Sequence, residues 1–211
     1  MNLSAINREF LRNRRWLLRQ GVAAALFLFP RLAAMGAEQA GAVEEVKGEA
    51  FAEALAVRRK LDREAAIFVG DDVSTERESR LRMRLGRDTM IRLGEQAHLK
   101  IDRFLVDAGG EMVLRSGPLL FDQPLGRAPA PVQIRSPFAL IAVRGTRFFA
   151  GPSNGRFGVF VERGSVEVTA AGQSVVVHDD EGTDIAFPGA RPTRVRRWLP
   201  ARVQAALESV D

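Results

Sequence analysis

The chain has 211 residues, 46% of them hydrophobic, which is enough for one packed domain with additional segments. It contains no cysteine, which excludes a disulfide scaffold, a thiolate metal site, a cysteine nucleophile and lipid attachment at cysteine. The formal net charge of +5 arises within residues 1–36, which hold six Arg and one Glu and leave 25 basic and 25 acidic residues elsewhere. Because the rest of the chain is electrically balanced, nucleic-acid binding is not expected.

Residues 1–37 have the composition of an export leader. Arg14 and Arg15 precede an apolar run over residues 21–29, and small residues follow as far as Ala37. This order describes a secretory signal peptide, and the paired arginines resemble the twin-arginine export signal. The nine apolar residues are too few to span a bilayer, so we expect cleavage after Gly36 or Ala37 and a periplasmic product. The alternative is an uncleaved N-terminal membrane anchor.

Across residues 38–190, short runs of alternating apolar and polar residues end at turn residues. Leu81, Met83 and Leu85, for example, alternate with arginines and are followed by Gly86. Alternation of this period marks strands with one buried and one solvated face. The runs are about five residues long and recur about every 8–12 residues, without a long amphipathic helix between them. The sequence therefore predicts an all-β, wound domain over residues 38–190 that is either solenoid-like or sandwich-like.

The most apolar strand is predicted in residues 134–146, which read I-R-S-P-F-A-L-I-A-V-R-G-T. Pro137 fixes a bend, and the unbroken apolar run 138–143 suits a strand buried on both faces or passing through the middle of a wound structure. Gly145 follows where the backbone needs conformational freedom. Alternation places three apolar side chains on one face, namely Ala139, Ile141 and Val143.

Arg144 falls on the opposite face of this strand, together with apolar residues. Its guanidinium must either extend to solvent or satisfy its donors on nearby carbonyls or a carboxylate. Two interpretations are open. Arg144 is a tethered residue of a central strand, or it belongs to a recognition surface.

The sequence offers little catalytic chemistry. The two histidines, His98 and His178, stand at predicted strand ends, where histidines are usually surface residues. The acidic stretches 71–72 and 179–181 lack the spacing of a calcium loop and are interpreted as turns. No nucleotide-binding, hydrolase or metalloprotease motif occurs. We expect a non-enzymatic protein without cofactor or metal.

Residues 191–211 form a basic tail. Four of its arginines are candidates for contact with an anion: Arg194, Arg196, Arg197 and Arg202. Pro200 suits the first turn of a short helix over about residues 201–207, with Val203 and Leu207 on one face. The helix either caps an open end of the β domain or, with the arginines, contacts anionic lipid or an acidic partner.

The central stretch resembles the signature strand of FecR-like periplasmic domains, a Thr/Ser-Pro dipeptide, an apolar run and Arg-Gly-Thr. Ser136-Pro137 and Arg144-Gly145-Thr146 occupy those places. The resemblance covers about residues 43–190 and implies a β-rich, solenoid-like domain of the bacterial envelope. Family members pass an outer-membrane transport signal across the inner membrane to a sigma factor.

Twenty residues precede the apolar run of the leader, which is too few for an anti-sigma domain, so we expect a freestanding exported domain. The predicted function is a non-enzymatic periplasmic module for protein interaction or sensing. Its expected partner is an unidentified envelope protein, which would bind at exposed sheet edges by strand addition. The alternative is an envelope-associated scaffold or ligand-binding protein whose basic tail, or uncleaved leader, contacts anionic lipid or polymer.

Overall fold

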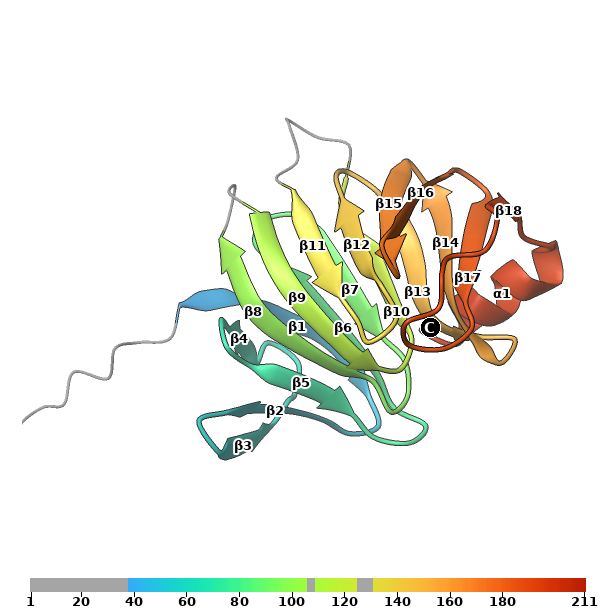
Figure 1. The fold of residues 1–211 in the computed structure, drawn as a ribbon. Helices are drawn as coiled ribbons and strands as arrows, with labels where there is room; N and C mark the ends of the chain where they lie inside the picture. The colour runs from blue at the N-terminus through green and yellow to red at the C-terminus, as the bar shows by residue number, and fades with distance from the viewer. Residues whose placement is uncertain (1–37, 106–108, 125–130) are drawn as a thin grey trace, which may run out of the picture. The chain divides into compact units, whose positions relative to one another are not determined.

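A computed structural model describes residues 38–105, 109–124 and 131–211, and these form eighteen strands and one helix (Figure 1). The predicted all-β class with a short C-terminal helix is confirmed. The predicted leader, with Arg14, Arg15 and the expected cleavage site, lies outside the described residues.

The strands form two nine-stranded sheets that are not closed into a barrel. Sheet A has the order β18 (Arg196–Arg197), β17 (Glu181–Ile185), β14 (Arg156–Arg163), β13 (Arg147–Ser153), β10 (Leu119–Asp122), β7 (Thr89–Leu93), β6 (Arg80–Leu85), β1 (Gln39–Lys47) and β4 (Ala66–Phe68). Sheet B has the order β16 (Gln173–His178), β15 (Ser165–Ala170), β12 (Leu140–Val143), β11 (Val132–Arg135), β9 (Gly109–Ser116), β8 (His98–Leu105), β5 (Asp72–Thr75), β2 (Ala50–Ala54) and β3 (Val57–Lys60). Neighbouring strands are antiparallel except β9 and β11, which are parallel.

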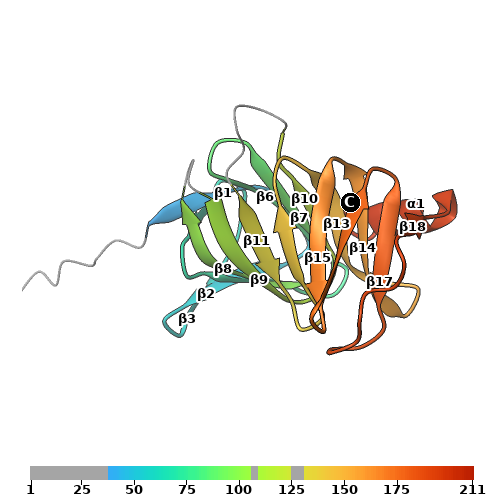
Figure 2. The same ribbon diagram turned by 45° about the horizontal axis from the view of Figure 1, so that its top comes forward.

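The chain winds from one sheet to the other. The pair β6 and β7 belongs to sheet A, β8 and β9 to sheet B, β10 to sheet A, β11 and β12 to sheet B, and the alternation continues to β18. The two sheets face each other across a shared interior (Figures 1 and 2). The domain is therefore wound like a solenoid in its chain path and layered like a sandwich in its packing.

The shared interior holds the residues that the sequence places at alternate strand positions. Leu81, Met83 and Leu85 are fully or almost fully buried, whereas Arg82 and Arg84 between them point to the outer face. The same cluster takes large side chains from both sheets: Ile91, Leu93, Phe121 and Phe148 from sheet A, and Leu99, Ile101, Met112, Ile134, Ile141 and Val168 from sheet B. Burial of these apolar faces supplies the main driving force for bringing the sheets together.

The central strand is shorter and less buried than predicted. β12 begins at Leu140, and its residues alternate between half-buried and buried, so the prediction of burial on both faces is wrong. The predicted inward face is confirmed, because Ala139, Ile141 and Val143 all lie in the shared interior. Within the sheet β12 pairs with β11 and β15, so it does occupy a central position.

A second, smaller apolar cluster lies on the outer face of sheet A. There Leu120, Phe149 and Phe160 meet Trp198 and the helix α1 (Pro200–Glu208), which contributes Ala206. The rings of Phe160 and Trp198 stack with their centroids 5.2 Å apart. The helix therefore covers an apolar face of the sheet and not an open end, which corrects the predicted capping role; Val203 and Leu207 do pack against this cluster, as predicted.

Trp198 anchors the C-terminal segment on sheet A, where two glycines leave room for its indole ring. A Cβ added at Gly182 would lie 2.2 Å from the Trp198 Nε1, and one added at Gly158 would lie 2.7 Å from the ring. These two glycines let the indole approach the backbone of β14 and β17 closely.

Replacing Trp198 by Ala should lower the free energy of unfolding by about 3–5 kcal/mol, because loss of the large indole ring would leave a cavity over the sheet. Trp198 is only 8% exposed. The neighbouring Leu199→Ala is the matched control, since Leu199 is 77% exposed and its truncation should change stability by less than about 0.5 kcal/mol. Urea unfolding followed by circular dichroism measures both. Equal effects of the two substitutions would contradict the anchoring role.

Candidate functional site

The Ser-Pro part of the signature forms a hydrogen-bonded turn before β12. The Oγ of Ser136 accepts hydrogen bonds from the backbone N–H groups of Phe138 (3.2 Å) and Ala139 (3.0 Å). The N–H of Ser136 donates to the carbonyl of Ala139 at 2.8 Å. Because the side chain takes up these N–H groups, they do not enter the sheet, which explains why the strand starts at Leu140.

The Arg-Gly-Thr part is the corner at which the chain passes from β12 in sheet B to β13 in sheet A. Gly145 has φ +64°, a conformation that favours glycine, and its N–H donates to Oε1 of Gln123 at 3.0 Å. The N–H of Gln123 in turn donates to the carbonyl of Thr146 at 2.9 Å. Thr146 is fully buried, and a Cβ on Gly164 would come within 2.8 Å of its Cγ2. The corner thus holds three sheet-to-sheet passages together.

Arg144 is the one signature residue that projects outward. It is exposed, and among the described residues it has no hydrogen bond or ion pair. The interpretation as a tethered arginine is therefore wrong. The other four signature residues, Ser136, Pro137, Gly145 and Thr146, shape the backbone, whereas Arg144 is free to meet a partner.

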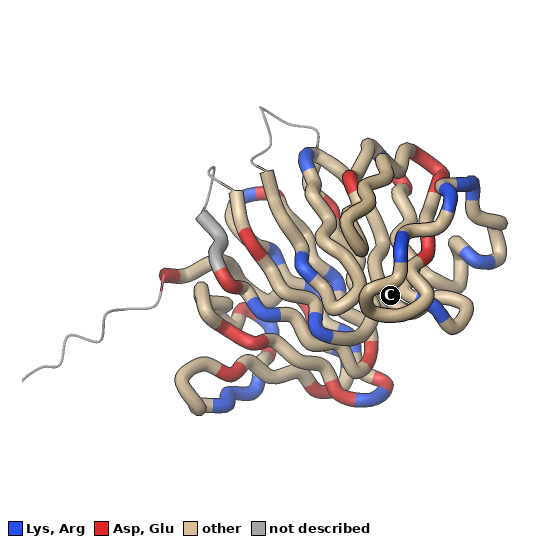
Figure 3. Tube along the Cα trace, viewed as in Figure 1, with Lys and Arg blue, Asp and Glu red and all other residues tan. Residues whose placement is uncertain are grey.

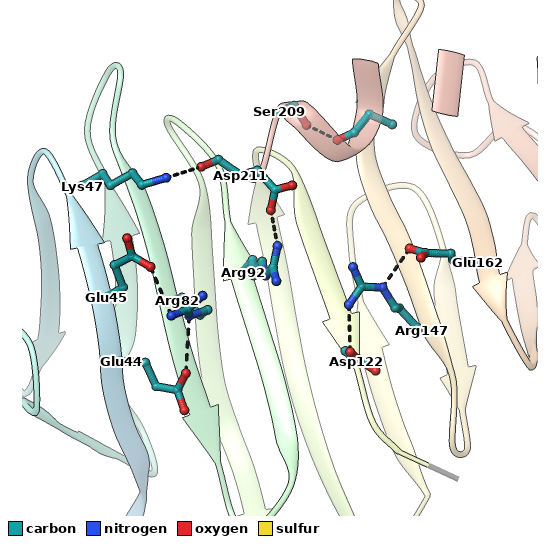
Figure 4. Close-up of polar contacts among 11 residues, drawn as sticks. Glu44, Glu45, Lys47, Arg82, Arg92, Asp122, Arg147, Glu162, Ser209 and Asp211 are labelled. Carbon is teal, nitrogen blue, oxygen red and sulfur yellow. Dashed lines mark hydrogen bonds and ion pairs between the residues drawn. The ribbon is translucent and has the colours of Figure 1, made fainter. Parts of the chain in front are cut away.

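A charged face lies beside the helix on the outer side of sheet A (Figure 4). Arg82 forms ion pairs with Glu44 (3.4 Å) and Glu45 (3.2 Å) on the neighbouring strand β1. Arg92 pairs with Asp211, whose backbone carbonyl also accepts a hydrogen bond from Lys47 at 2.8 Å. These cations are matched by acids, so the face is not an anion site.

Arg147 lies on the same charged face, toward β14 (Figure 4). Partial burial alone would lower its pKa, but its hydrogen bonds to Glu162 (2.8 Å) and Asp122 (2.9 Å), with the charges of these carboxylates, outweigh the burial and raise the pKa. Arg147 therefore stays charged at every physiological pH and joins β10, β13 and β14 through ion pairs.

The arginines of the C-terminal tail fall into two groups. Arg202 is engaged inside the domain: it donates to Asp184 (Nη1 to Oδ2, 3.2 Å) and to Ser153 (3.0 Å), and its guanidinium lies 3.5 Å from the centre of the Trp198 ring. It is therefore not available to an external anion, contrary to the sequence-based expectation. The other group is exposed and forms no ion pair within the described part of the chain: Arg191, Arg194, Arg196 and Arg197. We call these four residues the basic strip.

Edge strand β16 is the feature that sequence reasoning did not single out. It lies within the β domain predicted over residues 38–190, but nothing in the sequence of a single strand says that it has a neighbour on only one side. The histidines are exposed: His98 begins β8, and His178 ends β16. No group of three His, Asp or Glu side chains in the described ranges is arranged to hold a metal ion.

These features define an all-β domain with exposed strand edges and an exposed arginine at its signature corner. Residues 71–167 match the model of the family described as FecR protein. This match runs from the start of β5 into β15 and confirms, for this part of the chain, the resemblance predicted from the signature. No curated protein matches the sequence.

Solved structures share the fold, and two of them are of one protein. Both are crystal structures, at 1.65 and 2.50 Å resolution, of a protein described as a "putative anti-sigma factor" from Parabacteroides distasonis ATCC 8503. Each superposes with a TM-score of 0.52 at 17% sequence identity and covers 64% of this chain. The match spans 64% and 63% of the two solved chains, so it covers less than two thirds of their length. At this identity the likeness shows the fold.

Replacing Ser136 by Ala should lower the free energy of unfolding by about 1 kcal/mol, because two backbone N–H groups lose their acceptor. Replacing Arg144 by Ala should change the free energy of unfolding by less than about 0.5 kcal/mol, because the side chain is exposed and forms no hydrogen bond or ion pair in the described part of the chain. Thermal and urea unfolding test both variants. A large loss of stability in Arg144→Ala would show that the exposed arginine has a structural role after all.

Proposed function

We propose that the chain is an exported, non-enzymatic FecR-like domain that acts as a protein-interaction and sensing module in bacterial envelope signalling. The observation that carries this proposal is the match of residues 71–167 to the FecR family on a two-sheet fold shared with the protein described above. The match leaves part of the chain uncovered. The location in the periplasm and the binding of an envelope protein are therefore parts of the proposal.

The surface of the domain supports binding as its activity. Arg144 projects from the signature corner without an internal partner, and β16 presents an unpaired sheet edge. Sheet edges and unpaired charged side chains recognise other proteins by strand addition and charge complementarity.

The proposed location is the periplasm. The basic, apolar and small-residue order of residues 1–37 supports export, with Arg14 and Arg15 as the twin-arginine signal. Among the described residues, no helix has the length and apolar character needed to cross a membrane.

A second candidate function is contact with anionic lipid or polymer. The exposure of the basic strip favours it, as do the exposed side chains of Phe187 and Leu199 in the same segment. It ranks second because such contact gives no role to the sheet edge.

The export step is tested by comparing the native protein with Arg14→Lys/Arg15→Lys in a bacterium that has the twin-arginine system. We expect the native protein to begin near Ala37 by intact mass and to occur in the soluble periplasmic fraction, and the double variant to lose both properties. Arg8→Lys/Arg12→Lys, which alters the leader outside the arginine pair, should behave as the native protein. An uncleaved native protein in the membrane fraction would make residues 1–37 an anchor.

The signalling step is tested by transcript profiling. Cells that lack the protein and cells that carry only Arg14→Lys/Arg15→Lys should show the same change in expression, because neither has the domain in the periplasm. Cells with Arg8→Lys/Arg12→Lys should match the parent strain. An unchanged profile in the deletion strain, grown under a range of envelope conditions, would contradict a signalling function.

A further inference from the structure

Of the four strands at the sheet edges, β16 is the one built to accept another strand. β18 has two residues and β4 has three, and β3 carries Arg58, Arg59 and Lys60, which protect an edge against pairing. β16 has six residues, Q-S-V-V-V-H, with no acidic or strongly basic side chain and no proline. Its central Val176 is 50% exposed.

The hydrogen-bonding groups of β16 that point away from the sheet can be assigned from its hairpin. β15 and β16 are joined by the two-residue turn Ala171-Gly172, both with positive φ (46° and 72°), so the flanking pair Ala170 and Gln173 is hydrogen-bonded. Pairs alternate along an antiparallel ladder. Ser174, Val176 and His178 therefore direct their N–H and C=O groups outward.

One observation confirms this assignment. The N–H of His178 donates to Oε2 of Glu181, which lies beyond the strand and not on β15. For Ser174 and Val176, no hydrogen bond in the described part of the chain uses the outward backbone groups. The open edge of β16 thus offers two donors and two acceptors at alternate residues.

The basic strip lies at the same end of the domain. The segment after β17 returns along that strand: the N–H of Thr193 donates to the carbonyl of Asp184, Arg196 is paired with Gly182, and Arg197 is paired with Glu181. β17 follows β16 through the turn at residues 179–180, so β16 and the returning segment border the same end of the two sheets (Figure 1). Figure 3 shows the basic positions that lead into β18.

Four acids also border this end: Glu167 is the cross-strand partner of Val176, and Asp179, Asp180 and Glu181 follow β16. Asp179 accepts a hydrogen bond from the N–H of Gly164, and Glu181 accepts the one from His178. Both are therefore partly neutralised by backbone donors. Arg191 and Arg194, on either side of Thr193, are exposed and form no ion pair in the described part of the chain, so they are the cations of the strip that we expect to meet a partner.

We propose that β16 and the basic strip form one docking surface, which accepts an extended acidic segment of a partner protein as an added strand. Backbone groups of the segment pair with Ser174 and Val176, and its carboxylates face the basic strip, mainly Arg191 and Arg194. This inference rests on the proposed function and names the chemistry of its partner.

Charge decides between this occupant and two others. A second copy of the chain would add a neutral β16 strand and bring two basic strips together, which repel each other. An anionic membrane would neutralise the arginines of the basic strip but leave the outward N–H and C=O groups of β16 without hydrogen-bond partners. An acidic strand satisfies both features.

The surface is tested by fluorescence anisotropy with the purified protein and labelled peptides of about ten residues, the length that spans an edge strand. One peptide alternates Val with Glu, and the matched peptide alternates Val with Lys. We expect the Glu peptide to bind, with affinity falling as salt rises, and the Lys peptide to bind at least about tenfold more weakly. Equal binding of the two peptides would overturn the proposal.

The variants separate the edge from the charge. Val176→Pro removes an outward N–H without taking a bond from β15 and should weaken the Glu peptide about tenfold or more, as should Arg191→Glu/Arg194→Glu. The control Arg63→Glu/Arg77→Glu makes the same charge change at exposed loops away from this end and should bind as the native protein. Because Val176→Pro could disturb the fold, a Glu peptide N-methylated on alternate residues tests the same backbone bonds on the native protein and should bind as weakly.

Three results would overturn the docking surface: an N-methylated peptide that binds as well as the parent, a dimer that forms through β16, or binding of phosphatidylglycerol vesicles with none of the peptide. If the peptide fails while the deletion strain keeps its altered transcript profile, this surface is wrong and the proposed function stands. If the deletion strain shows no change, the proposed function fails whatever the peptide does.

Discussion

The whole domain depends on repeated passage of the chain between two sheets, because either sheet alone would leave an apolar face in water. The corner after β12 shows how such a passage is stabilised. Gly145 turns the backbone at positive φ, Gln123 bonds to both Gly145 and Thr146, and Gly164 comes close enough to Thr146 that a Cβ would clash. The signature motif is thus explained by the geometry of a sheet-to-sheet corner, with Arg144 as its outward-facing exception.

The sequence predicted the strands and their buried faces well, because alternation reports how a single strand is placed. Leu81, Met83 and Leu85 are buried as their spacing predicts. The sequence of a strand does not show which strands lie beside it. The choice between a solenoid and a sandwich, and the recognition of β16 as an edge strand, therefore required the order of strands in the sheets. The start of β12 was predicted two residues too early, because Ser136 takes up two N–H groups that apolar residues alone would have given to the sheet.

The arginines illustrate the same limit in electrostatic terms. Composition counts them as equivalent, yet Arg82, Arg92 and Arg147 are paired with acids across the outer face of sheet A. Arg202 seemed part of a uniform basic tail, but Asp184 and Trp198 hold it within the domain. Only the three-dimensional structure distinguishes arginines that are paired with acids of the domain from arginines whose positive charge remains unpaired at the surface.

The position of the helix decides which sheet edge stays open near the basic strip. The one helix of the described chain packs on the outer face of sheet A, where Trp198, Phe149 and Phe160 need cover, and leaves the edge of sheet B unprotected. An uncharged edge strand favours pairing with other chains unless charges oppose it. Here the basic strip lies at the same end of the domain, and its charge opposes self-association but favours an acidic strand. The family match ends at residue 167, within β15, so this edge, the basic strip and the helix all lie beyond the part of the chain that the family shares.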